Sequence, residues 1–209
     1  MSRAQSKPSY HHGDLRQSII TAGLARVRAE GVQALSLRQL ADELGVSTPA
    51  LYHHFRSKHA LLMSLGEAAM AEFVTVMQAA LKHDASAESF AIAYVGFARS
   101  EAALYDLIFG SLLWRDPNAG AFQAAARAHV RVITRYVQRM QDRGELPAKI
   151  NVLRVVQVAW ATLHGLCRMY NDGLAFTAET IEDIAKTAMA LIHQALNKES
   201  EKMLCVIQI

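Results

Sequence analysis

The chain has 209 residues, of which 52% are apolar, so it can bury a core in one large domain or in a small domain joined to a larger one. No run of 18 uncharged apolar residues and no apolar segment near the N-terminus occurs, so we expect neither a membrane-spanning helix nor a signal peptide. Residues 1–60 hold eight basic and four acidic side chains, whereas residues 61–209 hold 14 basic and 15 acidic ones, which indicates either an anionic partner for the N-terminal part or a chance asymmetry.

The first predicted helix begins at Asp14. This residue can cap the helix N-terminus while Gln17, three residues on, reaches back to it, a variant of the capping box. Apolar residues then recur at helical spacing up to Gly31, which is typical of a helix C-terminus. Because alanine and leucine are plentiful and β-branched runs are short throughout, we predict an all-α fold.

Two short helices are predicted next, with a tight turn between them. The first begins at Ser36 and ends at Gly45, a residue that accepts the left-handed backbone of a turn. The second begins at Ser47 or Thr48, either of which can cap it, and Pro49 suits its first turn because no N–H group is needed there. Three short helices with this turn predict a helix-turn-helix domain.

The two histidines in "LYHHFRSK" are expected to point in different directions from the second short helix. Successive residues rotate by about 100°, so Leu51 and Phe55 point into the core and His53 points outward. His54 falls at the edge of the buried face. Because the two histidines point in different directions, this geometry opposes a shared metal ion.

The outward residues of such a helix are those that enter the major groove of DNA. Thr48 and His53 can form hydrogen bonds with base edges or phosphates, and Pro49 can contact a thymine methyl group. Tyr52 and Lys58 suit phosphate oxygens.

Residues 50–61, "ALYHHFRSKHAL", resemble the signature of the TetR family, in which a small residue and Leu-Tyr-x-His-Phe end the recognition helix and a lysine starts the next one. The preceding "SLRQLADELGVST" resembles the family's second helix and turn. The likeness covers residues 15–62, and an all-helical remainder fits the family's ligand-binding and dimerising domain. It implies that the DNA-binding residues are Ser36, Arg38, Ser47, Thr48, Pro49, Ala50, Tyr52, His53 and Lys58.

An earlier stretch, "YHHGDLR", resembles the N-terminus of a TetR subset. We expect Tyr10, His11 and His12 to precede the first helix on a short arm that also carries Arg3 and Lys7. The arm either lies along the phosphate backbone or minor groove, or packs Tyr10 against the helices with the histidines solvated.

The rest of the chain is predicted to form longer helices. Ser57 can cap the next helix, which runs to about residue 82. Further helices are expected at 86–102, 103–112, 118–143, 151–172 and 178–196.

The two cysteines, Cys167 and Cys205, have neither disulfide nor metal spacing, which indicates a reducing cytoplasm.

The segment "AWATLHGLCRMYNDG" resembles the Trp/His/Gly motif of one TetR C-terminal domain type. Trp160 and His164 share a helical face, so they either line an effector cavity or belong to the core, with His164 bonded to a partner. Gly165 is expected to let another helix approach closely. The candidate residues for an effector pocket are Met70, Phe73, Met77, Phe97, Tyr105, Phe109, Trp114, Trp160 and His164.

The pattern of reactive residues does not indicate an enzyme. No carboxylate pair, nucleophile–base set or glycine-rich phosphate loop stands out, and His129 and His193 are isolated. We therefore expect no cofactor or metal. The alternatives are a nonspecific architectural DNA-binding protein and a metalloenzyme that uses the paired histidines.

The sequence therefore predicts a ligand-responsive regulator. Residues 1–60 form the arm and DNA-binding domain, 61–196 form a helical effector-binding and dimerisation domain, and 197–209 form a tail. A homodimer on a pseudo-palindromic operator is implied by the resemblance, with release by an unidentified small molecule. The candidate dimer-interface residues are Val155, Val156, Ala159, Leu163, Ile181, Ile184, Ala188 and Ile192.

Overall fold

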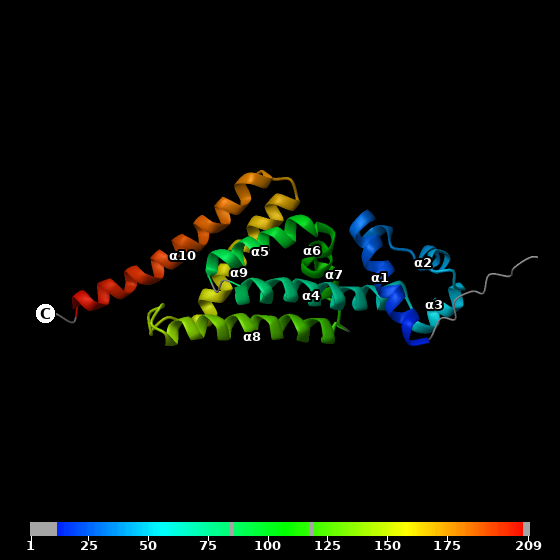
Figure 1. The fold of residues 1–209 in the computed structure, drawn as a ribbon, viewed down its shortest axis with the longest axis horizontal. Coiled ribbons are helices and arrows are strands. Elements are labelled where there is room, and N and C mark those ends of the chain that lie inside the picture. The colour runs from blue at the N-terminus through cyan, green and yellow to red at the C-terminus, as the bar shows by residue number, and fades with distance from the viewer. Residues whose placement is uncertain (1–11, 84–85, 118, 207–209) are drawn as a thin grey trace, which may run out of the picture.

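The computed structural model describes residues 12–83, 86–117 and 119–206 (Figure 1). Every regular element in these residues is a helix, which confirms the predicted all-α fold. In chain order the elements are α1 (His12–Glu30), the 3₁₀ turn η1 (Val32–Ala34), α2 (Leu37–Glu43), α3 (Thr48–His54), α4 (Lys58–His83), α5 (Ala87–Ser100), α6 (Ala102–Phe109), α7 (Ser111–Trp114), α8 (Gly120–Asp142), α9 (Val152–Asn171) and α10 (Ala178–Val206).

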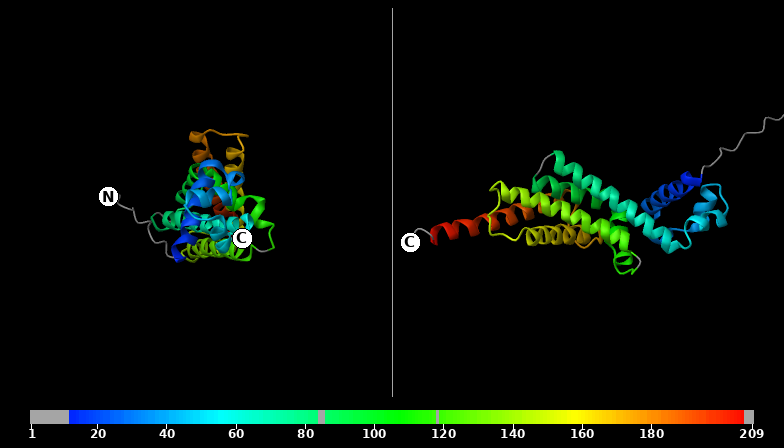
Figure 2. Two further views of the ribbon diagram at one scale, coloured as in Figure 1. Left: turned by 90° about the vertical axis from the view of Figure 1, so that its right-hand side faces the viewer. Right: turned by 90° about the horizontal axis from the view of Figure 1, so that it is seen from below.

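The helices α1, α2 and α3 form a small N-terminal domain at one end of an elongated molecule (Figures 1 and 2). Its core contains Val27 from α1, Leu40 and Ala41 from α2, and Leu51 from α3, all completely buried, with Phe55 beside them. Helical rotation assigned Leu51 and Phe55 to the inside, so on α3 the packing follows the sequence pattern.

Helix α1 begins at a different residue from the one predicted, whereas the glycines predicted at the ends of α1 and α2 have the expected backbone. The helix begins at His12, so Asp14 lies in its first turn instead of capping it, and His12 belongs to the helix and not to an arm. Tyr10 and His11 lie outside the described residues. Gly31 and Gly45 have φ angles of +80° and +65°, the left-handed backbone that a helix end or tight turn needs.

Helix α4 is the central element that joins the two parts of the molecule. It packs against α1 at one end and against α5, α6 and α8 farther along. Among the described residues it alone has the length and composition to cross a membrane, but half of its most apolar window is buried by its neighbours, as in the core helix of a globular protein. Because α4 already begins at Lys58, the predicted domain boundary at residue 60 falls inside a helix.

The larger part contains α5 to α10, and two of its predicted elements have different limits. The helix expected at 103–112 is broken at Gly110, where the backbone is extended (ψ 163°) and an added Cβ would lie 2.4 Å from the carbonyl oxygen of Asp106. Helix α10 continues to Val206, so most of the predicted tail is helical. It extends beyond the body at the end opposite the N-terminal domain (Figure 2).

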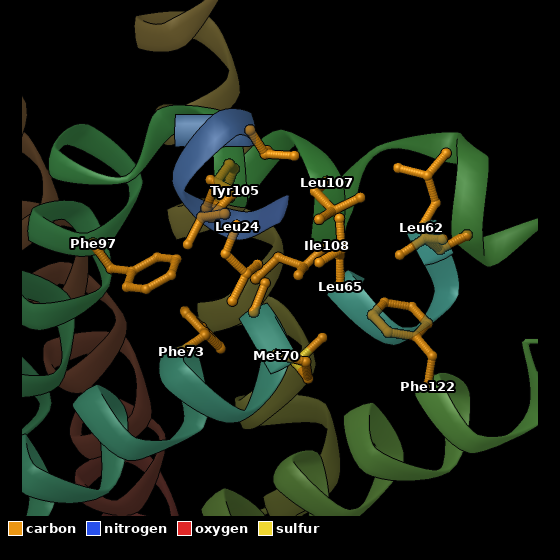
Figure 3. Packing of buried hydrophobic residues seen from close by; sticks show 14 of the residues in the cluster. Leu24, Leu62, Leu65, Met70, Phe73, Phe97, Tyr105, Leu107, Ile108 and Phe122 are labelled. Carbon is orange, nitrogen blue, oxygen red and sulfur yellow. The ribbon is translucent and has the colours of Figure 1, made fainter. Parts of the chain in front are cut away.

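A single apolar core crosses from one part to the other. Leu24 of α1, Phe73 of α4 and Tyr105 of α6 belong to one buried cluster, and Leu65 and Met70 continue it along α4 (Figure 3). Since the cluster is continuous, a shift of α4 or α6 in the body acts directly on the packing of α1.

Candidate DNA interface and ligand cavity

Helix α3 is held to the N-terminal domain by one face. The Ser47 Oγ accepts a hydrogen bond from the Ala50 N–H at 3.3 Å, which confirms the predicted cap, and Pro49 occupies the first turn. Leu51 is completely buried and Phe55 is 3% exposed. The opposite face is therefore available to a partner.

That outward face carries the side chains predicted to meet DNA. Tyr52 is 46% exposed although it is a large aromatic residue. Exposed side chains on α3 and its cap are Ser47, Pro49, Tyr52 and His53, with Thr48 and Ala50 half-buried between them. An exposed face that mixes hydroxyl, imidazole and apolar groups is suited to base edges and phosphates.

The paired histidines on α3 differ in exposure. His53 is exposed and His54 is half-buried, and their rings meet edge-on with centroids 5.5 Å apart. No group of three His, Cys, Asp or Glu side chains with metal-binding proximity occurs among the described residues. The arrangement offers one imidazole to a partner instead of a chelating pair.

The remaining predicted contacts lie beside α3. The Lys58 Nζ is exposed and donates a hydrogen bond to the Gln33 carbonyl oxygen at 3.3 Å, which leaves its other protons available to a phosphate. The Ser36 Oγ caps α2 by accepting from the Gln39 N–H at 3.5 Å. Arg38, in the first turn of α2, is exposed.

Two arginines of α1 connect the N-terminal domain to α4, contacts that the local sequence pattern does not predict. The Arg16 guanidinium donates to the Ser64 Oγ at 3.1 Å. Arg28 forms an ion pair with Glu72 of α4, and its Nε lies 2.7 Å from a carboxylate oxygen of Glu101, at the junction of α5 and α6. Part of the basic excess of residues 1–60 is thus neutralised by carboxylates within the protein.

A cavity of about 250 Å³ lies in the larger part. Its wall combines side chains from α4, α5, α6, α7, α8, α9 and α10. Of the predicted pocket residues, those in the wall are Met70, Phe73, Phe109, Trp114 and Trp160. Met77, Phe97 and Tyr105 are buried in the surrounding core instead, and His164 is half-buried beside Tyr105.

Helix α8 supplies a large part of the wall that sequence reasoning missed. Ala126, His129, Ile133, Val137 and Met140 all line the cavity and recur every three or four residues. This helical spacing is visible in the sequence, but it does not show whether these side chains face a cavity or a packed core.

The residues predicted to form a dimer interface are distributed differently in the structure. Four of them line the cavity: Val155, Val156, Ala159 and Ile192. Leu163 and Ile181 are completely buried inside the protomer, so they have no surface to give to a partner. Ile184 and Ala188 are half-buried. Periodicity identified the apolar faces of α9 and α10, but these faces pack mainly within one chain.

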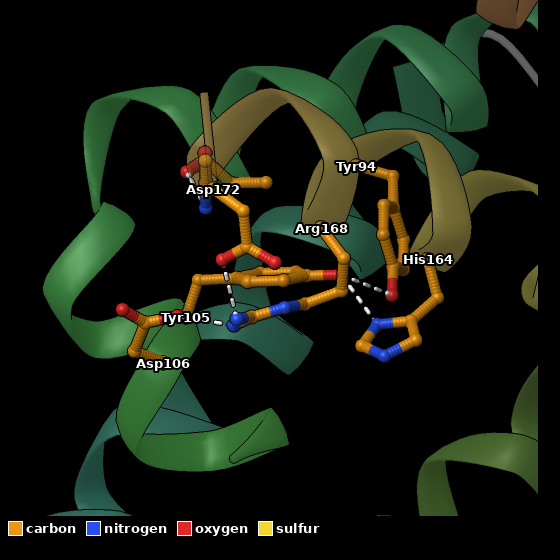
Figure 4. Close-up of polar contacts among 8 residues, drawn as sticks. Tyr94, Tyr105, Asp106, His164, Arg168 and Asp172 are labelled. Atoms are coloured by element: carbon orange, nitrogen blue, oxygen red, sulfur yellow. Dashed lines mark hydrogen bonds and ion pairs between the residues drawn. The ribbon is translucent and has the colours of Figure 1, made fainter. Parts of the chain in front are cut away.

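The Trp/His/Gly segment takes part in a chain of hydrogen bonds behind the cavity wall. The Trp160 Nε1 donates to the Tyr94 hydroxyl at 3.1 Å, and the hydroxyls of Tyr94 and Tyr105 are 3.2 Å apart. The Tyr105 hydroxyl lies 2.6 Å from the His164 Nδ1, while Arg168 pairs with Asp106 at 2.5 Å (Figure 4). Helices α5, α6 and α9 are therefore joined by buried or half-buried contacts among Tyr94, Tyr105, Trp160 and His164, and by an exposed ion pair between Arg168 and Asp106.

Burial controls the protonation of this network. Desolvation raises the pKa of the Tyr94 and Tyr105 hydroxyls, and it raises the pKa of the Cys167 thiol to about 12. Desolvation, assisted by the charge of Arg168, lowers the pKa of His164. All four groups are accordingly neutral near pH 7, and the charged members of the network are the paired Arg168 and Asp106.

A different histidine, His129 of α8, is the buried polar group of the cavity wall. Its side chain is 7% exposed, and neither ring nitrogen has a hydrogen-bond partner. The ring meets Phe73 of α4 edge-on, with centroids 5.4 Å apart. Desolvation lowers the pKa of His129 to about 4, so the imidazole is neutral.

Comparison with known proteins covers both parts of the chain. Residues 19–65 match the family described as bacterial regulatory proteins, tetR family, and residues 87–195 match the one described as tetracyclin repressor-like, C-terminal domain. The tetracycline repressor protein class A from transposon 1721 of Escherichia coli is 51% identical over 55 residues, which are 26% of each chain. The matched region thus spans about a quarter of that curated relative.

Two solved structures extend the similarity over most of the chain. A protein with unknown function from Rhodococcus sp. RHA1 superposes with a TM-score of 0.79 at 30% identity, covering 91% of this chain and 99% of that one. The transcriptional regulator PfmR from Thermus thermophilus has a TM-score of 0.62 at 21% identity, covering 84% of this chain and 97% of that one.

Proposed function

Because the chain belongs to the TetR family of bacterial regulatory proteins, we propose that it is a sequence-specific DNA-binding repressor that a small molecule releases from its operator. The observation that carries the proposal is the exposed outer face of α3, which ends in Tyr52 and His53 beside the exposed Lys58. In this proposal the chain acts in the cytoplasm as a regulator and not as an enzyme.

The roles of the interface residues follow from their chemistry. With α3 in the major groove, His53 and Thr48 form hydrogen bonds with base edges. Tyr52 and Lys58 bind phosphates and fix the position of the helix on the duplex. Arg38 adds a contact from the first turn of α2.

A single α3 reads too few bases for a specific site, so we propose a twofold dimer on a pseudo-palindrome. One face of α9 supports this arrangement: Val158 is 53% exposed and Met169 is 40% exposed. Between them Ala161 is exposed, and an added Cβ at Gly165 would meet no atom within 4 Å. The space at Gly165 is thus open in the protomer, which corrects the expectation of a close helix there and suits the approach of a partner helix.

Release by an effector follows from the position of α4. This helix lines the cavity with Met70 and Phe73 and begins at Lys58, beside α3. A ligand that favours one position of α4 therefore changes the placement of the N-terminal domain through the shared core and the Arg28 ion pairs. Two such domains at the wrong spacing cannot both enter successive major grooves.

The test is selection of bound sequences from random double-stranded DNA by the full-length protein. We expect enrichment of a pseudo-palindrome whose half-sites lie about one helical turn apart. Binding with no enriched sequence would favour a nonspecific architectural protein. Stoichiometric zinc in the purified protein together with no DNA binding would favour the metalloenzyme.

A further inference from the structure

The chemistry of the cavity wall limits the kind of molecule that can occupy it. Apart from tyrosines and tryptophans, the polar side chains among the described lining residues are Ser86, Arg127, His129 and His193. Arg127 and His193 are exposed and so stand where the cavity meets solvent. The Ser86 Oγ caps α5 by accepting from the Ser89 N–H at 3.0 Å. The Tyr94 hydroxyl is bonded to Trp160 and Tyr105, and the Tyr136 hydroxyl has Arg143 as a partner. His129 is therefore the deeply buried lining group whose polar atoms have no partner.

The unpaired state of His129 is unusual for a buried polar side chain. Buried donors and acceptors are nearly always hydrogen-bonded, because burial removes their bonds to water without replacing them. The imidazole has two such nitrogens and no partner for either. An apolar residue would fill the same position without this penalty, so the histidine points to a role that needs a hydrogen bond.

The protonation state of the imidazole decides what it can bind. Desolvation keeps the ring neutral, so it offers one N–H donor and one acceptor but no positive charge for an anion. A carboxylate or ammonium group placed against His129 would lose its hydration without gaining a counterion. A hydroxyl or carbonyl group would gain a hydrogen bond without that loss.

We propose that the cavity binds an uncharged, largely hydrocarbon molecule that carries one hydroxyl or carbonyl group, and that His129 is the residue that recognises this group. The inference rests on the proposed function for calling that molecule the effector. At about 250 Å³ the cavity is near the lower end of ligand pockets, roughly 300–1,000 Å³, so the molecule is small.

Binding at His129 also has a route to α4. The two ring nitrogens are buried, so the imidazole must rotate about its side-chain bonds to reach a ligand. Rotation breaks the edge-on contact with Phe73, which itself packs edge-on against Phe97 and Phe109 with centroids 5.2 and 5.3 Å away. The polar group of the ligand thus changes the packing of α4, the helix that begins beside the proposed DNA interface.

The experiment compares three ligands with the same eight-carbon chain: octan-1-ol, octanoate and octylammonium. The chain has two tryptophans, Trp114 and Trp160, and both line the cavity, so intrinsic fluorescence at pH 7.5 reports binding without a label. We expect the dissociation constant of octan-1-ol to be at least about tenfold lower than those of the two ions.

Substitutions then test the histidine. His129→Phe should weaken octan-1-ol binding by about fivefold to tenfold, because the ligand hydroxyl loses its partner. His129→Gln keeps a donor and an acceptor and should restore most of the affinity, which guards against a merely structural effect. His83→Phe, the same change at an exposed histidine that does not line the cavity, should leave the affinity unchanged.

Three results would overturn the proposal. They are octanoate binding as tightly as octan-1-ol, no fluorescence response to any of the three, and equal effects of His129→Phe and His83→Phe. Operator binding, measured separately on the same samples without ligand, tests the proposed function. If DNA binding is absent while octan-1-ol still binds through His129, the site stands and only its regulatory role is lost.

Discussion

The proposed DNA interface and the proposed ligand cavity are built in opposite ways. The interface comes mainly from one contiguous stretch, from Ser47 to Lys58, that is exposed on the surface of a small domain. The cavity comes from seven helices whose lining residues run from Met70 to Leu196. A surface site on one helix is fixed by local periodicity, whereas an internal site is fixed by which faces of distant helices happen to meet. The two regions should therefore respond differently to the same kind of change.

The largest expected effect comes from the core of the N-terminal domain. Leu51→Ala removes a completely buried side chain and should lower the free energy of unfolding by about 2–5 kcal/mol. Both tryptophans lie in the larger part, so denaturation followed by tryptophan fluorescence and by circular dichroism separates the two regions. We expect operator binding to be lost while the fluorescence transition moves little.

Leu153→Ala is the matched control, because this leucine of α9 is 46% exposed and its truncation should change stability by less than about 0.5 kcal/mol. If Leu51→Ala shifts both transitions together, the continuous core makes one cooperative unit of the whole chain. The N-terminal domain and the larger part would then unfold together, and their stabilities could not be changed separately.

The difference between the regions also explains what the sequence could predict. The inward positions of Leu51 and Phe55 follow from helical rotation, and the Ser47 cap follows from local hydrogen bonding, so both could be predicted without tertiary information. Leu163 and Ile181 have the same kind of apolar periodicity, but periodicity does not distinguish a partner chain from a neighbouring helix. For the same reason His129 looked isolated in the sequence although the fold places it in the cavity wall.

A second prediction concerns the stability of the larger part as a function of pH. Burial lowers the pKa of His129 to about 4 in the folded protein, against an ordinary value near 6.5. The unfolded chain therefore binds a proton at higher pH than the folded chain does. Stability from this group is fully present above about pH 6.5 and is lost as the pH falls toward 4, by about 3 kcal/mol in total.

The measurement is the urea midpoint of the tryptophan transition between pH 7.5 and 4.5, for the wild type and His129→Phe. The variant should lose most of the pH dependence, leaving the smaller contribution of His164, whose pKa is also lowered. Equal slopes in the two proteins would mean that His129 gains solvent or a partner in solution. The cavity would then admit water in spite of its apolar wall. The buried site and the surface site would differ less in their exposure to solvent.

The smallest expected effects distinguish two residues within the proposed DNA interface. Lys58→Ala should weaken binding to every DNA sequence alike, because an ammonium group on a phosphate reads charge and not sequence. Each neutralised phosphate contributes about 0.9 to the slope of log K against log salt. With one Lys58 from each protomer of a dimer, the slope should therefore fall by about 2.

His53→Ala should instead leave the salt slope nearly unchanged and reduce discrimination against altered half-sites by about 1–3 kcal/mol. Both side chains are exposed, so neither substitution removes core packing, and the pair compares base reading with phosphate binding on one surface. Equal losses from both variants on all sequences would show that the outward face of α3 contributes only charge and shape. In that case the local sequence would predict which surface of the protein binds DNA, but not which residues select the DNA sequence.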